Sequence, residues 1–570
     1  MIRIQQLTLQ AQHTEQELER QIRRELRLAP GEPVSWEIRK RSLDARKKPK
    51  LLYCYTIDVS VSEKREQRIV SHADGRQIVP VTEQPYCFPP AGTHKLENPP
   101  VIIGTGPAGL FCGLLLARHG YRPLLLEQGA DVDRRCRDVE TFWKSGRLDP
   151  RSNVQFGEGG AGTFSDGKLN TLVKDKDGRN REVLRLFVEA GADPSVLYDS
   201  RPHIGTDRLV KIVKNIRKQI ESYGGTVRFG ARVTDVTIKD NNITGVIING
   251  AEHLPCQAAV LAIGHSARDT FRMLYEHDLE MEAKEFAVGF RVEHRQEAIN
   301  LSQYGTAQPG ALGAAPYKVT AKASDGRGVY SFCMCPGGYV VNASSEEGRL
   351  AVNGMSYSGR QGDNANSAII VSVKKTDFPS EHPLAGIAFQ RQLEEAAWQA
   401  GKGKIPLQRL GDFQDVFARR TKEDVRQKQT GECSISCKST EFSVLRSPKR
   451  ENHPSPCIKG AYVYADLTEI LPKKITAAFL EGMEQFSHKI KGFADPGTLV
   501  SAVESRTSSP VRILRGETMQ SSVHGLYPCG EGAGYAGGIT SAAMDGMRIA
   551  EAIRRHYMPF TEEKERKWKP

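Results

Sequence analysis

Residues 101–129 of this protein, VIIGTGPAGLFCGLLLARHGYRPLLLEQG, decide its fold class. An apolar strand leads into Gly104-Thr-Gly106-Pro-Ala-Gly109, a helix follows, and a second strand ends at Glu127. In such a unit the first glycine permits a tight turn, the second admits a pyrophosphate to the backbone, and the third lets helix and strand pack closely. The helix start can bind phosphates, and an acid placed like Glu127 can bind a ribose hydroxyl. The stretch therefore predicts a dinucleotide-binding domain.

Length and composition indicate a globular protein of several domains. The chain has 570 residues, which excludes a single small binding module. Hydrophobic residues make up 39% and charged residues 26%, unlike disordered or collagen-like chains. No apolar run approaches the roughly 20 residues that a membrane-spanning helix needs, and the N-terminus lacks a signal-peptide pattern. We therefore expect a cytoplasmic protein without membrane contact, whose 11 scattered cysteines are reduced.

Residues 1–95 form a separate N-terminal α+β module in our interpretation. A strand-like start precedes an amphipathic stretch at residues 14–28, and two extended runs follow at residues 34–40 and 51–61. Between these runs lies a basic segment, residues 39–50, with seven basic side chains against one acid. We expect this segment to be a hairpin connection. It is either simply solvated, or it makes weak contacts with the phosphates of RNA or another polyanion.

The remainder of the chain alternates between two kinds of pattern. Residues 98–281 and 497–557 contain strand, glycine-rich turn and helix units, whereas residues 282–496 are rich in strands. The strand-rich segments FAVGFRVEH, GVYSFCMCPGGYVVNAS and SAIIVSV are expected in one larger sheet. The predicted fold class is therefore α/β: a three-layer, Rossmann-like FAD/NAD(P)-binding domain with an inserted strand-rich substrate domain and the N-terminal α+β module.

Three further segments bear on the choice between FAD and NAD. A second glycine-rich loop, VQFGEGGAGTFSDGKLN, lies at residues 154–170, and an apolar strand ends in LAIGHS at residues 261–266. Near the C-terminus Gly530-Glu531 precedes GAGYAGGITSAAMDG, where a helix is expected to begin near Gly538. A helix N-terminus there would stabilise the negative charge of a reduced flavin near N1 and O2. The plain alternatives are a flexible surface loop and a structural helix cap.

The chain also resembles a known family. Its GxGPAG unit, its GGAGTFSDGKLN loop and its CGEGAGYAGGITSAA ending resemble the glutathione-reductase-type FAD fold, and most closely the family of uncharacterised FAD-dependent dehydrogenases. The segments FAVGFRVEHRQ, FCMCPGG and SRTSSPVRI resemble stretches of the same family. The resemblance covers about residues 101–553. It implies bound FAD, with Glu531 on the ribityl side, where related flavoproteins often carry the shorter Asp.

Motifs and resemblance together give the candidate cofactor-binding residues. They share a place in, or directly beside, a glycine-rich turn or at the end of an apolar strand. They are Gly104, Gly106, Pro107, Ala108, Gly109, Glu127, Gly159, Gly160, Gly162, Thr163, Ser165, Gly264, Gly530, Glu531, Gly537, Gly538 and Ile539.

Five residues are candidates for the catalytic chemistry. Arg506 and Arg360 could hold a carboxylate or phosphate, because a guanidinium pairs with both in bidentate geometry. His294 could transfer a proton. Cys333 and Cys335 alternate on an extended segment, so they are either a redox dithiol or two small buried residues. We expect no metal site, because the pair lacks two further ligands.

These observations favour a FAD-dependent oxidoreductase that acts on a small, anionic substrate. A separate nicotinamide domain is not expected, since we find no second GxGxxG unit. Two alternatives remain open. The first is an RNA-directed flavoprotein, such as a tRNA modifier, whose N-terminal module delivers the substrate. The second is a flavin redox sensor or scaffold without enzymatic activity.

Overall fold

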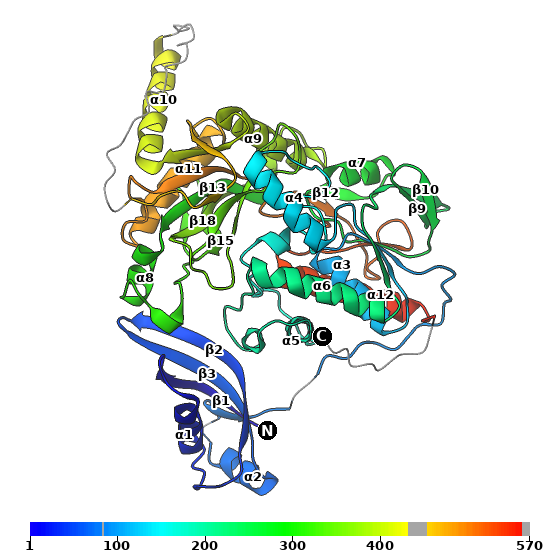
Figure 1. Ribbon diagram of the computed structural model, residues 1–570, viewed down its shortest axis with the longest axis vertical. Coiled ribbons are helices and arrows are strands. Elements are labelled where there is room, and N and C mark those ends of the chain that lie inside the picture. The colour runs from blue at the N-terminus through cyan, green and yellow to red at the C-terminus, as the bar shows by residue number, and fades with distance from the viewer. Residues whose placement is uncertain (74, 83–84, 431–452, 561–570) are drawn as a thin grey trace.

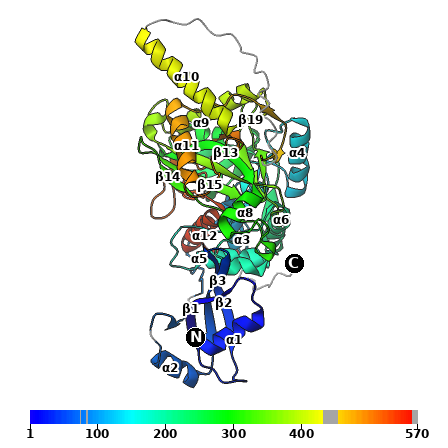
Figure 2. The ribbon, with the colours of Figure 1, turned by 90° about the vertical axis from the view of Figure 1, so that its left-hand side faces the viewer.

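The computed structural model describes residues 1–73, 75–82, 85–430 and 453–560. The N-terminal module lies at one end of the molecule, and helix α10 (Leu410–Thr430) projects from the other (Figures 1 and 2). The nucleotide-binding domain and the strand-rich insert lie between these ends and pack against each other (Figure 1). No helix within the described ranges is long and apolar enough to cross a membrane.

A five-stranded parallel sheet forms the middle layer of the nucleotide-binding domain, in the order β24-β11-β5-β6-β7. Successive strand residues point to opposite faces, so Ile102 joins one core cluster while Val101 and Ile103 join another. The strands are β5 (Val101–Ile103), β6 (Leu124–Leu126), β7 (Thr226–Arg228), β11 (Ala259–Leu261) and β24 (Leu526–Pro528). Every residue of β5, β11 and β24 is buried, as expected for a sheet covered on both faces.

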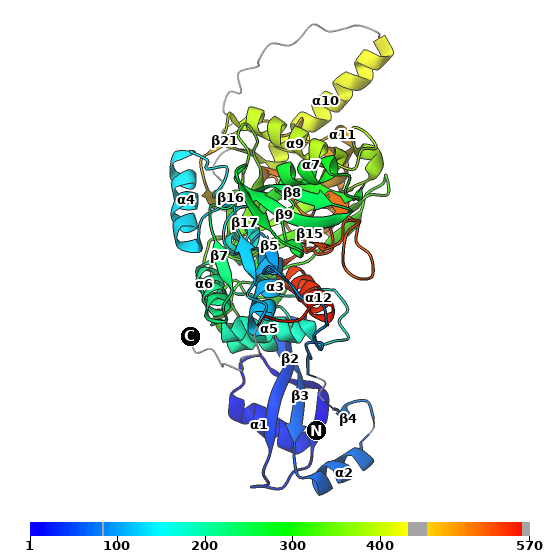
Figure 3. The ribbon, with the colours of Figure 1, turned by 90° about the vertical axis from the view of Figure 1, so that its right-hand side faces the viewer.

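Helices cover one face of this sheet and a small antiparallel sheet covers the other. The helices are α3 (Pro107–Arg118), α5 (Arg179–Glu189), α6 (Thr206–Ser222) and α12 (Ile539–His556), which lie together in Figure 3. The other layer contains β8 (Val233–Lys239), β9 (Asn242–Ile248), β10 (Glu252–Pro255) and α7 (Arg268–Glu276). These three layers confirm the predicted fold class.

The insert is built on a seven-stranded sheet in the order β14-β15-β18-β13-β22-β19-β21. Its strands are β13 (Phe286–Arg295), β14 (Thr320–Lys322), β15 (Gly328–Cys335), β18 (Asn364–Val373), β19 (Ile405–Arg409), β21 (Tyr462–Tyr464) and β22 (Leu499–Glu504). Helices α8 (Gln296–Tyr304), α9 (Ala385–Gly401) and α11 (Lys473–Ser487) pack around it. Helix α4 (Val132–Ser145) shares a core cluster with Val341 and Met355 of the insert, which lie outside this sheet.

Two details of the insert differ from the sequence-based expectation. The YVVN part of the second expected strand segment is β16 (Tyr339–Asn342), which pairs with β17 (Val352–Met355) and β20 (Ile458–Lys459) in a separate sheet. Strand β22, expected in the second part of the nucleotide-binding domain, belongs to the seven-stranded sheet. All its residues are buried, so the sequence LVSAVE carries no alternation that would show which sheet it joins.

The N-terminal module contains a four-stranded sheet in the order β2-β3-β1-β4. Its elements are β1 (Ile2–Gln10), α1 (Glu15–Glu25), β2 (Ser35–Lys47), β3 (Lys50–Ser60), α2 (Glu63–Ser71) and β4 (Ile78–Pro80). Outside this module, the small strands β12 (Met281–Ala283) and β23 (Val511–Ile513) pair with each other. They lie where the insert leaves and rejoins the nucleotide-binding domain.

The basic segment is not the hairpin connection that we expected. Most of it lies inside β2, and the turn is formed by Lys48 and Pro49 alone. Arg39 contacts the buried carboxylate of Asp58, with 2.5 Å between Nε and Oδ2. Arg41 contacts Asp199 of the nucleotide-binding domain, with 2.7 Å between Nε and Oδ1. These acids lie far away in sequence, so local charge counting could not reveal that they pair with the segment.

Glu394 on α9 joins the insert to the nucleotide-binding domain. Its fully buried carboxylate lies between Arg268 of α7 and Arg506, at 2.7 and 2.8 Å. Ser505 also donates to it, at 2.7 Å. Burial alone would raise the pKa of Glu394, but the two guanidinium groups bring the pKa well below its usual range. This shared carboxylate therefore stays charged and holds three distant segments together.

We predict that Glu394→Gln costs about 3–5 kcal/mol of unfolding free energy, because Arg506 loses its charged partner and Arg268 keeps only Glu346. The folded-state pKa of Glu394 lies below its unfolded value, so its contribution is complete above the unfolded pKa. That contribution is lost as pH falls through the folded-state pKa. Thermal unfolding of the wild type and of Glu394→Gln between pH 3 and 7 measures this difference in stability. Equal melting temperatures at neutral pH would contradict the prediction.

Candidate FAD-binding site

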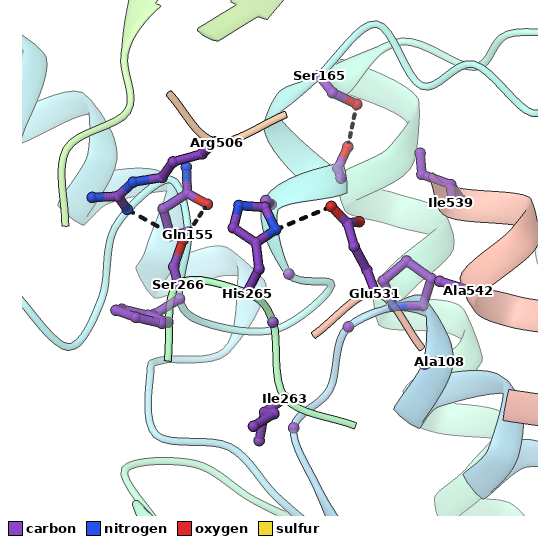
Figure 4. A pocket seen from close by; sticks show the side chains of 18 of the residues that line it. Ala108, Gln155, Ser165, Ile263, His265, Ser266, Arg506, Glu531, Ile539 and Ala542 are labelled. Atoms are coloured by element: carbon purple, nitrogen blue, oxygen red, sulfur yellow. Dashed lines mark hydrogen bonds and ion pairs between the residues drawn. The ribbon is translucent and has the colours of Figure 1, made fainter. Parts of the chain in front are cut away.

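One cavity of about 380 Å³ lies at the carboxyl ends of β5, β6 and β11 and extends to the insert. Figure 4 shows part of it, with side chains from several distant segments of the chain facing the same space. The predicted residues that line it are Gly104, Gly106, Pro107, Ala108, Glu127, Gly160, Gly162, Ser165, Gly264, Cys333, Cys335, Arg506, Glu531, Gly537, Gly538 and Ile539. Ligands of open parallel sheets bind at this edge.

Four glycines leave open space where a side chain would otherwise stand. A Cβ built on Gly264, Gly537 or Gly538 meets no atom within 4 Å, and one on Gly106 meets only the Cα of Gly160, at 4.0 Å. All four glycines line the cavity. The residues present therefore fit a large ligand that approaches the backbone closely, as a dinucleotide does.

Three other predicted glycines are required by backbone packing or backbone conformation. A Cβ on Gly109 would lie 2.0 Å from the carbonyl oxygen of Gly104, which is the close helix–strand approach that the motif requires. Gly104 itself has φ of +103° and leaves no room beside Ala262. Gly530, with φ of +76°, donates its N–H to Asp545 of α12 at 2.8 Å. These glycines shape the cavity edge, and Gly109 and Gly530 do not line it.

Glu127 ties the first glycine-rich turn to the second glycine-rich loop. Its carboxylate accepts from the N–H and the hydroxyl of Thr105, at 3.0 and 2.8 Å. It also accepts from the N–H groups of Gly129 and Gly157, at 3.0 and 3.1 Å. A ribose hydroxyl at this acid would join or replace one of these four donors. The ribose contact remains a prediction.

The second loop is fixed from behind by a side chain that sequence analysis missed. Arg135 of α4, fully buried, donates to five carbonyl oxygens of residues 153–160. Gly159 and Thr163 lie in this loop without lining the cavity, and a Cβ on Gly159 would clash with the Thr163 hydroxyl at 2.2 Å. Ser165 closes the next turn, donating to the Gly162 carbonyl at 2.6 Å. The loop thus presents Gly160 and Gly162 to the cavity.

Helix α12 begins at the cavity, as the sequence predicts. Gly538 is its N-terminal cap, and the first N–H groups of a helix have no partner within the helix. The N–H of Gly537 donates to Ser541, at 3.2 Å. Glu531 lies on the neighbouring turn, where one carboxylate oxygen is 3.0 Å from Nδ1 of His265 (Figure 4). A positive helix end and a carboxylate therefore lie side by side.

Arg506 lines the cavity, but its guanidinium is already engaged. It makes two bonds to Glu394, both 2.8 Å, and one each to the Ser345 and Ser266 hydroxyls, at 2.5 and 3.2 Å. Four of its five N–H donors are thereby occupied. Arg506 acts as part of the domain joint, and this geometry does not favour the substrate anchor that we expected.

Two other catalytic candidates lie outside the cavity lining. Arg360 pairs with Asp166, at 2.5 Å, and so supports a residue that does line the cavity. His294 lies in the core of the insert, where Nε2 is 2.7 Å from the carbonyl of Phe493. Burial lowers the pKa of His294 to about 4, so the ring is neutral at physiological pH. The sequence did not show whether the side chain of His294 faces the cavity or the core.

The two cysteines do meet at the cavity. Both line it: Cys333 is exposed, whereas Cys335 is buried and its thiol donates to the Cys333 carbonyl at 3.2 Å. A bulge between Phe332 and Cys335 interrupts the strand pairing here, so simple alternation does not describe the two side chains. Burial raises the pKa of Cys333 to about 12 and also raises the pKa of Cys335.

Sequence analysis missed four charged residues in the lining: Asp166, Lys168, Arg232 and Glu504. Lys168 contacts Asp166 at 3.3 Å and donates to the carbonyl of Met334. Glu504 pairs with Arg291 of β13, at 2.9 Å. The sequence holds a weak signal for Lys168, which lies within the second glycine-rich loop. It holds none for Glu504, because LVSAVE resembles any buried strand end.

Comparison with known proteins identifies the class. Residues 285–437 and 427–507 match a family model described as FAD-dependent protein, C-terminal domain-like, and residues 102–157 match an NAD(P)-binding Rossmann-like domain. Residues 1–60 match a domain of unknown function, DUF8436. An uncharacterised protein of Clostridium beijerinckii is 43% identical over 557 residues, which are 97% of this chain and 98% of that protein.

Solved structures show more distant similarity. CtdE in complex with FAD has a TM-score of 0.30 and 12% identity, over 80% of this chain and 83% of that one. A variant of quinol fumarate reductase FrdA of E. coli has a TM-score of 0.30 and 12% identity, over 81% and 71% of the two chains.

The fold and the glycine-lined cavity define a flavoprotein with a Rossmann-like domain, and FAD is its cofactor. Within this class, the chain belongs to the same family as the uncharacterised Clostridium beijerinckii protein.

We predict that Gly106→Val folds normally but loses FAD. The new side chain would enter the open space beside Gly160 where the motif places the pyrophosphate. We expect at least about a hundredfold weaker FAD binding, roughly 3 kcal/mol, measured by titration of the apoprotein with FAD. The matched control is Gly516→Val, which is exposed, has open space around it and lies outside the cavity. Normal FAD content in Gly106→Val would disprove the placement.

Proposed function

We propose that the protein is a FAD-dependent oxidoreductase whose small-molecule substrate binds at the insert end of the cavity. One observation carries the proposal: a single cavity is lined both by the dinucleotide-binding glycines and by side chains of the insert. The insert contributes Phe332, Cys333 and Cys335 from β15 and Asn353 and Gly354 from β17. A substrate there would lie beside the flavin and away from bulk water.

Bound FAD supplies a ring system that accepts or donates a hydride. The chain contributes binding and positioning. The N-terminus of α12 presents a positive dipole end to the cavity, and Glu531 offers a carboxylate to hydroxyl groups. Asp166, held by Arg360 and Ser356, fixes the loop that carries Lys168. The result is a rigid wall against which a substrate can be oriented.

Lys168 is the residue that we propose to hold an anionic or carbonyl group of the substrate. Among the described residues that line the cavity, the lysine and arginine side chains are Lys168, Arg232 and Arg506. Arg506 is engaged with Glu394, and Arg232 pairs with Asp269. The ammonium of Lys168 has three donors and two assigned partners, and its side chain is 33% exposed. One donor is therefore available to a ligand.

The two alternative functions have less support. In the basic segment Arg39, Arg41 and Arg46 pair with carboxylates of the protein itself, which weakens the attraction for RNA. A thiol-based sensor needs a reactive thiolate, and the raised pKa values of Cys333 and Cys335 oppose its formation. An enzyme with a small-molecule substrate fits the cavity better than either alternative.

Anaerobic screening tests the proposed function. The purified holoprotein is mixed with panels of metabolites, including hydroxy acids, amino acids and reduced nicotinamides, and loss of flavin absorbance is followed. We expect at least one class to reduce the flavin at a saturable rate. If no compound reduces it, and the reduced flavin passes its electrons to no acceptor other than oxygen, the proposed function fails.

We predict that Lys168→Met raises KM for a carboxylate-bearing substrate about ten- to a hundredfold, because a charge-assisted hydrogen bond is lost. FAD content should not change, and neutral analogues should lose less. The matched control is Lys174→Met, an exposed lysine on the same loop that does not line the cavity. An unaltered KM in Lys168→Met would exclude the anchoring role.

We also predict that Cys333 is unreactive in the native protein. Because its pKa is raised to about 12, iodoacetamide at pH 7.5 should alkylate it at least about tenfold more slowly than the surface residue Cys87. The rate at Cys333 should continue to rise with pH beyond the range where ordinary thiols level off. Peptide mass spectrometry after timed labelling measures both rates. Faster labelling of Cys333 would favour the sensor alternative.

A further inference from the structure

Four carboxylates line the cavity within the described part of the chain: Glu127, Asp166, Glu504 and Glu531. Glu127 accepts from four donors, and Asp166 pairs with Arg360 and Lys168. Glu531 lies on the turn before α12 with a side chain 29% exposed. Glu504, with a side chain 3% exposed, differs from all three because it lies at the end of β22 in the insert.

Glu504 is held by one oxygen only. Its Oε2 is 2.9 Å from Nε of Arg291, the partner that the structure assigns to this carboxylate among the described residues. Arg291 is itself completely buried and donates to Asn366 at 2.6 Å and to the carbonyl of Cys333 at 3.2 Å. The second carboxylate oxygen, Oε1, therefore keeps its lone pairs for a ligand.

The surroundings keep Glu504 able to bind a proton. Burial raises the pKa of Glu504, and the charge of Arg291 opposes that rise. The other titratable group facing it is the Cys333 thiol of β15, which is protonated at neutral pH. Arg506, two residues further along, is neutralised by Glu394. Because its pKa is raised, this carboxylate is easier to protonate than an exposed one and can accept a proton from a ligand.

We propose that Glu504 takes up the proton of a substrate O–H or N–H group while the hydride of the adjacent carbon passes to FAD. The inference rests on the proposed function and narrows its substrate class to alcohols and amines. The step is balanced: the C–H bond breaks and its electron pair leaves with the hydride, which reduces FAD. The O–H or N–H bond breaks toward Glu504, and a C=O or C=N bond forms.

The geometry also orients this reaction. Glu504 ends β22, and the cavity lining next to it includes Asn353 of β17 and Cys333 of β15. Lys168 lies close to Cys333, because its ammonium donates to the carbonyl of the next residue, Met334. A substrate anchored at Lys168 can thus present its reacting hydroxyl or amine to Glu504. Glu504 is then a catalytic residue and Arg291 positions it.

The first test needs no substrate. The midpoint potential of the bound flavin is measured from pH 5.5 to 9 by equilibration with dyes, for wild type and Glu504→Gln. Reduction adds negative charge near Glu504, so the wild type should take up an extra proton and its potential should fall more steeply with pH over part of the range. Glu504→Gln should lose that steep part. Above that pH range, its midpoint potential should be higher than that of the wild type.

The matched control is Glu293→Gln. Glu293 is another buried carboxylate beside Arg291 in sequence, with a pKa raised to about 7 by burial, but it bonds Asn364 and Cys457 and does not line the cavity. Its replacement should leave the potential curve unchanged. If Glu504→Gln also follows the wild-type curve, or if Glu293→Gln loses the steep part equally, the proposal is overturned.

The second test uses any alcohol or amine that the screen identifies. Glu504→Gln should lower the rate of flavin reduction by about 10²- to 10⁴-fold, with FAD content and substrate binding retained. If Glu504→Gln folds poorly because Arg291 loses its counter-charge, the double variant Arg291→Met/Glu504→Gln removes both charges and should show the same loss. An unaltered reduction rate in either variant overturns the proposal. A wild-type flavin that no metabolite reduces overturns the proposed function instead, while the potential still reports on Glu504.

Discussion

The site depends on the convergence of five backbone carbonyls on the guanidinium of Arg135. This side chain bonds the carbonyls of Asn153, Val154, Gly157, Glu158 and Gly160 at 2.7 to 3.2 Å. A loop with so many buried carbonyls needs a donor for each of them, and no strand ladder supplies these donors. Burial lowers the pKa of Arg135 to about 10, so it remains charged at neutral pH. Its charge-assisted bonds hold the second glycine-rich loop in one shape.

The two glycine-rich segments form one unit because of that loop. The N–H of Gly157 donates to Glu127, and Gly160 lies against Gly106, where an added Cβ would be 3.1 Å from the Gly106 Cα. The turn that would take the pyrophosphate is therefore braced by a loop that begins about 50 residues later. Arg135 lies on the same helical face as Val132, Val139 and Phe142. An arginine on an otherwise apolar face is the signal that could have revealed it.

The sequence predicted those parts of the fold that depend on neighbours in the chain. The unit around Gly104, Gly106 and Gly109 and the start of α12 at Gly538 follow from strand, glycine and helix in direct succession. Gly104 answers a local demand for a positive φ and Gly109 one for close backbone approach, whereas Gly106 and Gly538 leave open space at the cavity. Such demands are visible in a few consecutive residues, and the predicted cofactor residues lie at or directly behind the cavity.

The parts that could not be predicted are those set by a partner far along the chain. Arg506 is 112 residues from Glu394, and Arg41 is 158 residues from Asp199. An arginine that binds a ligand and one that binds a buried glutamate have the same local sequence, so the assignment of Arg506 required the fold. The same holds for His294. Side chains of its strand alternate between two faces, and the sequence does not show which face meets the cavity.

The insert end of the cavity, where we propose that the substrate binds, is built from paired charges. Lys168 is balanced by Asp166, Glu504 by Arg291 and Arg506 by Glu394. Buried pairs of this kind add little net stability, because desolvation offsets most of their attraction. What they do provide is position: each fixes one charged group while leaving selected atoms unbonded, as with one donor of Lys168 and one oxygen of Glu504. The unbonded donor of Lys168 and the unbonded oxygen of Glu504 would select ligands by the placement of an acceptor and a donor as well as by charge.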